Sequence, residues 1–227
     1  MKKYAVIVAG GSGTRMGTEI PKQFLLLNNK PVLWYSLQAF LTAFDDIQIV
    51  LVLPANHIEQ GTQIIASTKA AERIKITAGG STRYDSVQNG LKHVTEKSVV
   101  FVHDGVRCLV TKDLIQRCYT QAIDKGNAIP AIAVTDSLRT ITTEGNDVID
   151  RSKVRSIQTP QTFLSDILLP AFNQPWEVAF TDEASVVEKN GTVIHLIEGA
   201  IDNIKITTPL DLLIAERILL EREKSDR

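Results

Sequence analysis

The sequence predicts an α/β protein in which a Rossmann-like, open and mostly parallel sheet carries helices on both faces and a β-hairpin arm projects from the core. Two observations support the sheet: short apolar runs alternate with stretches of helical spacing, and several runs are apolar at every position, as strands buried on both faces require. A third supports the arm, because residues 135–153 are polar and lack helical periodicity. We therefore expect a single domain over residues 1–227 with an arm at about 135–153.

The first half of the chain contains most of the expected sheet. The apolar runs predict strands over residues 4–8, 47–53, 74–77, 98–102 and 128–134, and the helical spacing between them predicts helices over 31–44, 56–67, 81–94 and 111–125. Pro31 suits a first helical turn, since a proline lacks only an N–H group that would have no partner there. Ser81 and Thr111 suit N-caps, because their hydroxyls can accept hydrogen bonds from the first turn.

The arm is expected to be a β-hairpin. Two β-type segments flank Glu144-Gly145-Asn146, which has good turn chemistry. An isolated two-stranded hairpin is only marginally stable in water, so we expect it to pack against something, most simply a second copy of the chain. The alternative is a loose surface insertion.

Globular patterning returns after the arm. We expect helices over 164–172 and 182–189 and a strand over 192–196. The last helix is expected to begin at Thr208-Pro209-Leu210-Asp211, which combines an N-cap, a first-turn proline and an acid at the capping-box position. No linker, repeat or low-complexity segment divides the chain, which favours one domain.

The composition is ordinary for a globular protein, with 44% hydrophobic and 22% charged residues. The 25 basic and 26 acidic residues leave a net charge of −1, which predicts no attraction to nucleic acid or to an anionic membrane. Cys108 and Cys118 fit neither a metal spacing nor a disulfide framework, which favours a reducing compartment. Because no run is typical of a membrane span or a secretory signal, we expect a cytoplasmic protein.

A glycine-rich loop, AGGSGTRMG over residues 9–17, follows the first apolar run and precedes Pro21-Lys22. It is not a dinucleotide-binding G-x-G-x-x-G loop, because Met16 stands where the third glycine is needed, and no Gly-Lys-Ser/Thr follows at Walker spacing. Its glycines nevertheless expose backbone N–H groups to an anion, and Arg15 and Lys22 add positive charge. These basic residues favour phosphate binding over the alternative, a simple tight turn between strand and helix.

The ends of two further expected strands also carry polar residues, where open parallel sheets bind their ligands. Gly79-Gly80 follow the third strand, with Ser86 one helical turn later, and His103-Asp104 follow the fourth. A carboxylate that faces a phosphate loop can hold Mg²⁺ directly or through water, so Asp104 is the candidate metal ligand. The alternative for Asp104 is a cap or turn residue, and His103 is more typical of a packed histidine.

Other basic and hydroxyl residues lie in the second half. Each alone is typical of a surface residue or a helix cap, and only together could they build a site: Arg151, Arg155, Thr159, Thr181, Asp182, Asn203 and Lys205. Such a site needs no general base if the nucleophile is a phosphate monoester, because a second pKa of about 6 leaves it mostly an oxyanion at neutral pH. It would act by positioning and by charge neutralisation.

Taken in order, these motifs resemble those of nucleotidylyltransferases that join the CMP of CTP to a sugar or polyol phosphate, most closely the 2-C-methyl-D-erythritol 4-phosphate cytidylyltransferase family of non-mevalonate isoprenoid synthesis. The similar motifs span nearly the whole chain: AGGSGTRMG, PKQF, GGSTRYDSV, HDGVR, DSLRT, IDRS, QTPQTF, TDEAS and DNIKIT. The resemblance implies in-line attack of the polyol phosphate on the α-phosphate of CTP, release of pyrophosphate, and Mg²⁺ as cofactor. It also implies a homodimer in which the arm reaches into the partner's site.

The resemblance also implies a role for each matching residue. Nucleotide binding falls to Ala9, Gly10, Gly11, Ser12, Gly13, Thr14, Arg15, Lys22, Gly79, Gly80, Arg83, Ser86, Asp104 and Gly105. Substrate binding falls to Asp104, Arg107, Asp136, Ser137, Arg151, Thr159, Thr181 and Lys205, of which Asp136, Ser137 and Arg151 would act in trans. The catalytic set is Arg15, Lys22, Arg151 and Lys205, and the metal ligand is Asp104.

The chain departs from the family pattern at two places. Gly105-Val106-Arg107-Cys108 replaces the usual Ala-Ala-Arg-Pro, which keeps the arginine and loses the rigidity of proline, and Ser137 replaces a common threonine.

Two other functions remain open at this point. Ribitol-5-phosphate cytidylyltransferases share the glycine loop, the QTPQ segment and the NIKITTP ending, although IDRSKVRSIQTPQTF and TDEASVVE look closer to the methylerythritol branch. A non-catalytic nucleotide-binding regulator is the other, and the retained set Arg15, Lys22 and Lys205 disfavours it.

Overall fold

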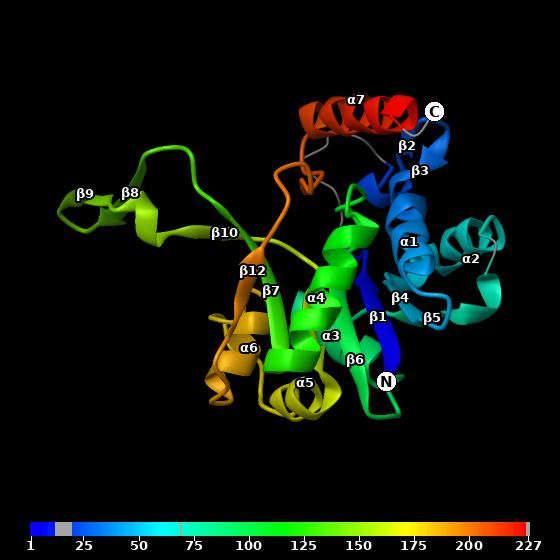
Figure 1. Ribbon diagram of the computed structural model, residues 1–227, viewed down its shortest axis with the longest axis horizontal. Coiled ribbons are helices and arrows are strands. Elements are labelled where there is room, and N and C mark those ends of the chain that lie inside the picture. Colours follow the sequence, from blue (N-terminus) through cyan, green and yellow to red (C-terminus); the bar gives the residue numbers. More distant parts are fainter. Residues whose placement is uncertain (12–19, 69, 226–227) are drawn as a thin grey trace.

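A mixed, mostly parallel sheet organises the computed structural model, which describes residues 1–11, 20–68 and 70–225 (Figure 1). In this described part, eight strands form one sheet: β1 (Lys2–Val8), β4 (Gln48–Leu53), β5 (Ile74–Ala78), β6 (Ser98–Asp104), β7 (Asn127–Ala133), β10 (Arg155–Ile157), β11 (Gln161–Leu164) and β12 (Leu196–Glu198). The strand order is β10-β7-β11-β6-β1-β4-β5. The eighth strand, β12, also pairs with β7.

The strand directions confirm the predicted fold class. β1 pairs in parallel with both β4 and β6, β4 pairs in parallel with β5, and β12 pairs in parallel with β7. The two antiparallel members are β10 and β11, which follow the arm. Because β11 enters between β6 and β7 and runs opposite to both, these two strands also point the same way.

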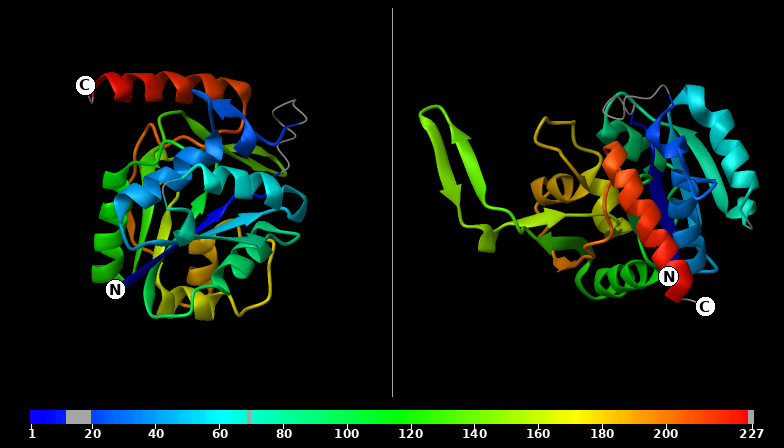
Figure 2. Two further views of the ribbon diagram at one scale, coloured as in Figure 1. Left: turned by 90° about the vertical axis from the view of Figure 1, so that its right-hand side faces the viewer. Right: turned by 90° about the horizontal axis from the view of Figure 1, so that it is seen from above.

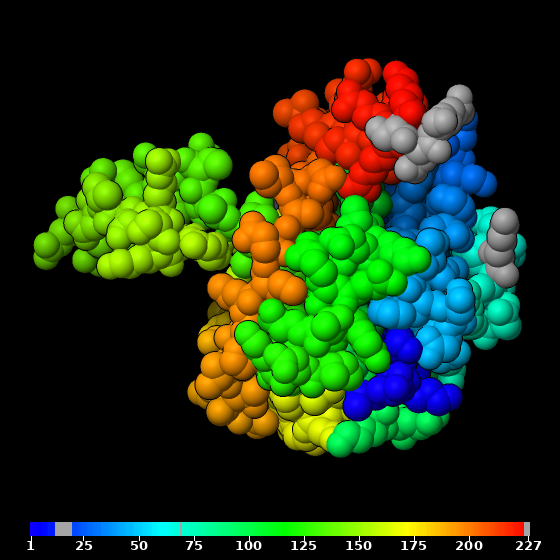
Figure 3. All heavy atoms as spheres, in the orientation of Figure 1, coloured from blue at the N-terminus to red at the C-terminus, as the bar shows by residue number. Residues whose placement is uncertain are grey.

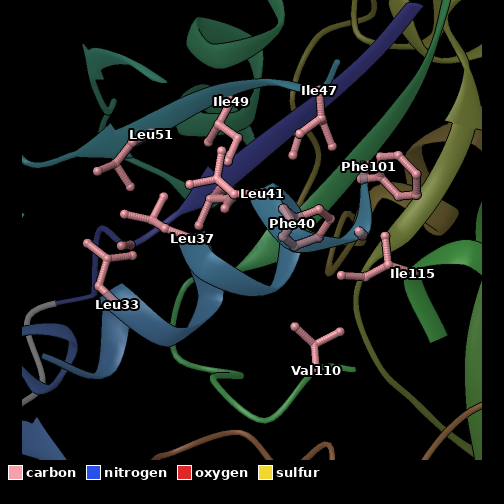
Figure 4. Packing of buried hydrophobic residues seen from close by; sticks show 14 of the residues in the cluster. Leu33, Leu37, Phe40, Leu41, Ile47, Ile49, Leu51, Phe101, Val110 and Ile115 are labelled. Carbon is pink, nitrogen blue, oxygen red and sulfur yellow. The ribbon is translucent and has the colours of Figure 1, made fainter. Parts of the chain in front are cut away.

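Helices cover both faces of the sheet, as the sequence predicts. On one face α1 (Val32–Ala43), α2 (Ile58–Ala66) and α4 (Lys112–Lys125) pack against Ala5, Ile7 and Phe101. Figure 4 shows how Leu33, Leu37, Phe40 and Leu41 of α1 lie against Ile47, Ile49 and Leu51. On the other face α3 (Arg83–Leu91), α5 (Ser165–Ala171) and α6 (Glu183–Lys189) pack against Tyr4, Val6 and Val8. Alternate residues of β1 therefore bury on opposite faces, as strand geometry requires.

The last helix, α7 (Pro209–Ser225), lies across the end of the molecule at which the parallel strands finish (Figures 1 and 2). It contributes Ala215 to a third apolar cluster with Leu27, Val106 and Leu109. Its predicted start is confirmed, because Asp211 accepts hydrogen bonds from the N–H groups of residues 207 and 208 at 2.8 and 2.7 Å. This end of the sheet is thus closed on one side by α7.

The predicted arm is a hairpin of β8 (Leu138–Thr142) and β9 (Gly145–Ile149), and it projects from the body in Figure 1, in the right-hand view of Figure 2 and in Figure 3. Thr142 pairs with Gly145, so the turn is formed by residues 143 and 144, one position earlier than the sequence indicated. Ile141 is 81% exposed and Val148 75% exposed. Two large apolar side chains therefore face solvent on a two-stranded ribbon.

Several predicted boundaries were wrong by a few residues. Thr82, not Ser81, is the N-cap of α3, because its hydroxyl accepts from the N–H of Asp85, whose carboxylate accepts from the N–H of Thr82 in return. Pro31 is the N-cap of α1 and not part of its first turn. The predicted strand at 192–196 is instead Leu196–Glu198, because the side-chain amide of Asn127 bonds the backbone at 193 and 195 and so replaces a ladder there.

Short elements complete the described structure and were not predicted. They are the hairpin of β2 (Leu26–Leu27) and β3 (Lys30–Pro31), and the 3-10 turns Lys22–Phe24, Ala55–His57, Ala71–Arg73 and Arg151–Lys153. Within the described ranges, no helix has the combination of length and apolar character that a membrane span needs. Organisation as a single domain stays a prediction.

Both cysteines are buried thiols, and burial raises the pKa of each to about 12. Because only the thiolate is strongly nucleophilic, we expect the native protein to leave Cys108 and Cys118 unmodified by iodoacetamide at pH 8, and both to react in denaturant. Mass spectrometry of the intact chain measures this. Modification of Cys108 in the native state would show that the cluster beneath α7 opens readily.

Candidate active site at the carboxyl edge of the sheet

The candidate site lies where the order of the parallel strands reverses. β4 and β5 lie to one side of β1 and β6 lies to the other, so the crevice between the ends of β1 and β6 is the usual ligand position in such sheets. Val8 pairs directly with Asp104 in the last step of this ladder. The glycine loop therefore leaves β1 beside the carboxylate that ends β6.

A hollow of about 270 Å³ opens at this position. It combines the ends of β1 and β6, the loop before α3, the turn at Lys22 and the segment before α7. The residues that line it are Val8, Ala9, Gly10, Gly11, Lys22, Gln23, Gly80, Ser81, Thr82, Arg83, Ser86, Asp104, Val106 and Lys205. Segments from both ends of the chain thus meet at one cavity, into which charged side chains reach.

Asp104 is the centre of charge in this hollow, and it is only 7% exposed. Its Oδ2 lies 2.8 Å from Lys205 Nζ and 3.7 Å from Arg107 Nε, and its Oδ1 lies 3.2 Å from Arg83 Nη2. Burial alone would raise the pKa of this carboxyl, but the three cations outweigh burial and hold the pKa well below its usual range. Asp104 is therefore ionised in the folded protein.

Arg83 is shared between two carboxylates. Besides Asp104, it donates to both oxygens of Glu183, at 2.5 Å from Nη1 and 3.1 Å from Nη2. Glu183 is the first residue of α6 and is 1% exposed. Sequence reasoning did not propose Glu183, although it lies in the TDEAS motif next to two residues that it did consider.

A buried hydrogen-bonded chain supports the backbone of Asp104. The hydroxyl of Thr159 accepts from the N–H of Asp104 at 3.0 Å, which leaves its hydrogen for Nδ1 of His103, also at 3.0 Å. The ring then carries its hydrogen on Nε2, 3.2 Å from the carbonyl oxygen of Arg107. Burial lowers the pKa of His103 to about 4, so the ring is neutral at pH 7. The prediction of a packed histidine is confirmed.

The segment that carries Lys205 is fixed by neighbours of Thr159. Asn203 donates through its side-chain amide to the carbonyl of Thr159 at 2.9 Å. Gln158 donates to the carbonyl of Ala200 at 2.8 Å and accepts from its N–H at 3.1 Å. Arg107 donates to the carbonyl of Asn203 at 2.8 Å. These bonds tie the QTP segment to the loop before α7 and so place Lys205 beside Asp104.

Two glycines of the site are required by close packing. A Cβ at Gly80 would lie 2.2 Å from Cβ of Asp85, and one at Gly105 would lie 2.9 Å from Cβ of Ala9. Ser86 completes the loop, since its hydroxyl accepts from the N–H of Gly80 at 3.1 Å and donates to the carbonyl of residue 82 at 2.9 Å. Side chains at either glycine would push apart the loops that border the hollow.

The structure gathers part of the predicted site. Nine predicted residues line the hollow: Ala9, Gly10, Gly11, Lys22, Gly80, Arg83, Ser86, Asp104 and Lys205. Gly79, Gly105, Arg107 and Thr159 stand directly behind it, where their contacts are with the protein itself. Ser12, Gly13, Thr14 and Arg15 lie outside the described residues.

Four predicted substrate-binding residues are not brought to the hollow within this chain. Asp136 and Ser137 lie between β7 and β8, and Arg151 begins the turn after β9, where it donates to the carbonyl of Thr135. Thr181 is exposed just before α6. Gln23 was missed, although it belongs to the PKQF motif; it lines the hollow and donates to the carbonyl of Ala9 at 2.9 Å.

Within the part of the chain that the structure describes, the site offers a divalent metal ion one carboxylate, that of Asp104, at the edge of the hollow. Among the described residues, no three His, Cys, Asp or Glu side chains gather as a metal cage. Asp104 is nevertheless a carboxylate at the edge of a hollow suited to phosphates, and Mg²⁺ commonly binds through one or two carboxylates together with substrate phosphates and water. The donor set therefore fits an ion that arrives with a phosphate ligand.

Comparisons with known proteins identify a family. Residues 4–221 match the model of the family described as 2-C-methyl-D-erythritol 4-phosphate cytidylyltransferase. The protein of that name from Porphyromonas gingivalis is 47% identical over 219 residues, which cover 96% of this chain and 98% of that one. The one from Bacteroides thetaiotaomicron is 43% identical over 96% of this chain and 100% of its own length.

Solved structures give the same result. The 4-diphosphocytidyl-2C-methyl-D-erythritol synthase of Anaerococcus prevotii superimposes with a TM-score of 0.83 at 25% identity, over 96% of each chain. The 2-C-methyl-D-erythritol 4-phosphate cytidylyltransferase of Thermus thermophilus superimposes with a TM-score of 0.76 at 29% identity, over 96% of this chain and 98% of that one. With the motifs, the fold and these matches in agreement, the chain belongs to the 2-C-methyl-D-erythritol 4-phosphate cytidylyltransferase family.

Proposed function

We propose that the hollow at the ends of β1 and β6 binds CTP and that Lys22, Lys205 and Arg15 drive the transfer of its CMP group. As a family member, the chain is a cytidylyltransferase that acts on CTP and 2-C-methyl-D-erythritol 4-phosphate. This confirms the methylerythritol prediction over the ribitol and non-catalytic alternatives. The observation that carries our assignment is the meeting of Lys22, Arg83 and Lys205 with Asp104 in one hollow.

The reaction needs charge neutralisation more than proton transfer. A phosphate oxygen of the methylerythritol substrate forms a bond to the α-phosphorus of CTP, the bond from that phosphorus to the β-phosphate oxygen breaks, and pyrophosphate leaves with the electron pair. At neutral pH the attacking phosphate is already mostly dianionic, since its second pKa is about 6. Lys22 and Lys205 would stabilise the negative charge that gathers on the α-phosphate, together with Arg15 of the glycine loop.

A magnesium ion would be held by Asp104 and phosphate oxygens, and would supply further positive charge when bound. The chain's own residues set where it could bind. Arg83 and Lys205 fix both oxygens of Asp104 at the rim, at 3.2 and 2.8 Å. Asp104 therefore has a defined orientation before any ligand arrives, which lowers the cost of ordering it later.

Recognition of the nucleoside is assigned to the loop before α3. This loop contains Gly79 and Gly80, and it is held close to α3 by the hydrogen bond from the N–H of Gly80 to the hydroxyl of Ser86. Gly80, Ser86 and Arg83 line the hollow. Recognition of the polyol phosphate is assigned to Lys205. The family resemblance assigns the same role to Arg107, Thr159 and Thr181. Because Arg107 and Thr159 already bond within the protein, we assign them the shaping of this part of the site.

The arm is proposed to complete the site of a second copy in a homodimer. Its exposed Ile141 and Val148 need a partner surface, and among the described residues the two hairpin strands pair with each other and with no further strand. Asp136, Ser137 and Arg151 stand on the same arm. In such a dimer these residues would reach the partner's polyol phosphate.

Location in the cytoplasm stays a prediction from the sequence.

Substitution of Lys22 or Arg15 by alanine is expected to lower kcat by about 100-fold or more, because each removes a cation from a developing phosphate charge. Pyrophosphate release from CTP measures the rate, and circular dichroism checks the fold. Lys112→Ala, an exposed lysine at the start of α4, is the matched control and should keep full activity. Near-normal turnover in either variant would remove that residue from the mechanism.

Thr159→Val is expected to lower the free energy of unfolding by about 1–3 kcal/mol, because it leaves the N–H of Asp104 and Nδ1 of His103 without their buried partner. Thr159→Ser keeps the hydroxyl and should recover most of that loss. Urea denaturation compares the two variants. A fully stable Thr159→Val protein with only a raised KM for the polyol phosphate would instead mark the hydroxyl as a direct substrate ligand.

Mixed dimers test the arm. If Arg151 acts in the partner's site, inactive Lys22→Ala and Arg151→Ala chains form hybrids in which one of the two sites carries both native residues. Random exchange of equal amounts should then restore about a quarter of wild-type activity. Each variant incubated alone is the control. Absence of recovery, with exchange proven by mass spectrometry of differently labelled chains, would assign both residues to one chain's own site.

A further inference from the structure

Glu183 is a buried carboxylate that the mechanism above does not use. It does not line the hollow, yet both of its oxygens bond Arg83, which does. Arg83 in turn holds Oδ1 of Asp104 through Nη2 at 3.2 Å and through Nε at 3.4 Å. A single guanidinium therefore joins α6 to the carboxylate at the end of β6.

The donors of Arg83 are almost fully committed to these two carboxylates. A guanidinium has five N–H groups in one plane. Nε uses its hydrogen on Asp104, Nη2 bonds both Asp104 and Glu183, and Nη1 bonds Glu183. Four of the five N–H groups are thus directed at carboxylates. In this arrangement Arg83 has a fixed plane, and most of its hydrogen-bonding capacity is not offered to a phosphate.

Glu183 itself is rigidly placed. Gln161 of β11 donates to the carboxylate of Asp182 at 2.8 Å and accepts from the N–H of Ala184 at 2.8 Å, so the residues on both sides of Glu183 are held by one buried amide. Asp182 also caps α6 by accepting from the N–H of Ser185 at 2.9 Å. The carboxylate of Glu183 therefore meets Arg83 in a geometry that the sheet imposes.

The ion pair is not needed to join α3 to the segment before α6. Tyr84, next to Arg83, stacks on Phe172 and Phe180, with ring centroids 4.8 and 5.8 Å apart. Its hydroxyl also lies within hydrogen-bond distance of the carbonyl oxygens of residues 172 and 174. An acidic residue in a first helical turn is favourable even when exposed, whereas burial of a charge is costly. Burial raises the pKa of Glu183, and the charge and hydrogen bonds of Arg83 oppose that rise, so Arg83 is the group that stabilises this buried carboxylate.

We propose that Glu183 is a positioning residue for nucleotidyl transfer, which holds Arg83 in the plane that orients Asp104 and keeps that guanidinium from binding CTP phosphates in an unproductive way. The inference rests on the proposed role of Asp104 in the site. With Glu183 present, Arg83, Arg107 and Lys205 face two carboxylates. Without the charge of Glu183, Arg83 keeps its bonds to Asp104 but loses the contact that fixes its plane at the rim of a triphosphate site.

Glu183→Gln tests this by removing the charge at nearly constant shape. We expect kcat to fall about 10- to 100-fold while the KM for CTP changes less than threefold, because the freed arginine still attracts the triphosphate but no longer orients Asp104. Glu183→Asp, which keeps the charge, should recover part of kcat. Glu188→Gln, the same substitution at an exposed position of α6, is the matched control and should behave as wild type.

A spectroscopic measurement tests the proposal independently of the reaction rate. NMR of ¹⁵N-labelled arginine side chains, assigned through Arg83→Lys, should show hindered rotation of the Arg83 guanidinium before CTP is added. In the Glu183→Gln protein this rotation should be faster, because of the charged contacts only those with Asp104 remain. A freely rotating Arg83 in the wild type would overturn the inference.

The kinetics separate this inference from the proposed function. A folded Glu183→Gln enzyme with wild-type kcat would contradict the positioning role of Glu183. If the Asp104→Asn enzyme is inactive in the same assay, the proposed site still stands. Activity retained in Asp104→Asn would remove the basis of both. A Glu183→Gln protein that unfolds more easily but keeps kcat per folded molecule would also count against positioning, because it would show a structural contribution only.

Discussion

The ionised carboxylate of Asp104, buried among Arg83, Arg107 and Lys205, is the interaction on which the rest of the site depends. A charge in this position is tolerated only because opposite charges and hydrogen bonds surround it. Burial would raise its pKa, but these cations hold the pKa well below its usual range, so the carboxylate is charged at neutral pH. Each cation comes from a different segment, and the need to satisfy one carboxylate thus draws these segments to one edge of the sheet.

The second half of the chain acts on this edge mostly through backbone and buried side chains. Gln158, Thr159 and Gln161 belong to the QTPQTF motif, and their side chains bond respectively to the loop before α7, to the backbone of Asp104, and to the start of α6. One short stretch beside β6 therefore fixes the approach of both Lys205 and Glu183.

The departure Gly105-Val106-Arg107-Cys108 is consistent with the packing around it. Gly105 lies so close to Ala9 that a side chain would press on the start of the glycine loop. Val106 and Cys108 are buried in the cluster beneath α7, and the N–H of Arg107 bonds the carbonyl of Asp104 at 2.9 Å. The turn is thus closed by a hydrogen bond and by apolar burial where the family pattern has proline.

The sequence by itself determined the open parallel sheet, the projecting hairpin and the glycine loop, because apolar periodicity and turn chemistry act over a few residues. The sequence also placed Asp104 at the end of a strand. In the folded sheet that strand end lies beside the end of β1, where the site forms. Only the tertiary structure decided that Glu183 and Arg83, 100 residues apart, share an ion pair, and that Thr159 serves the backbone of Asp104. Such partners leave no local signal, since a buried charge or hydroxyl is defined by what folding brings beside it.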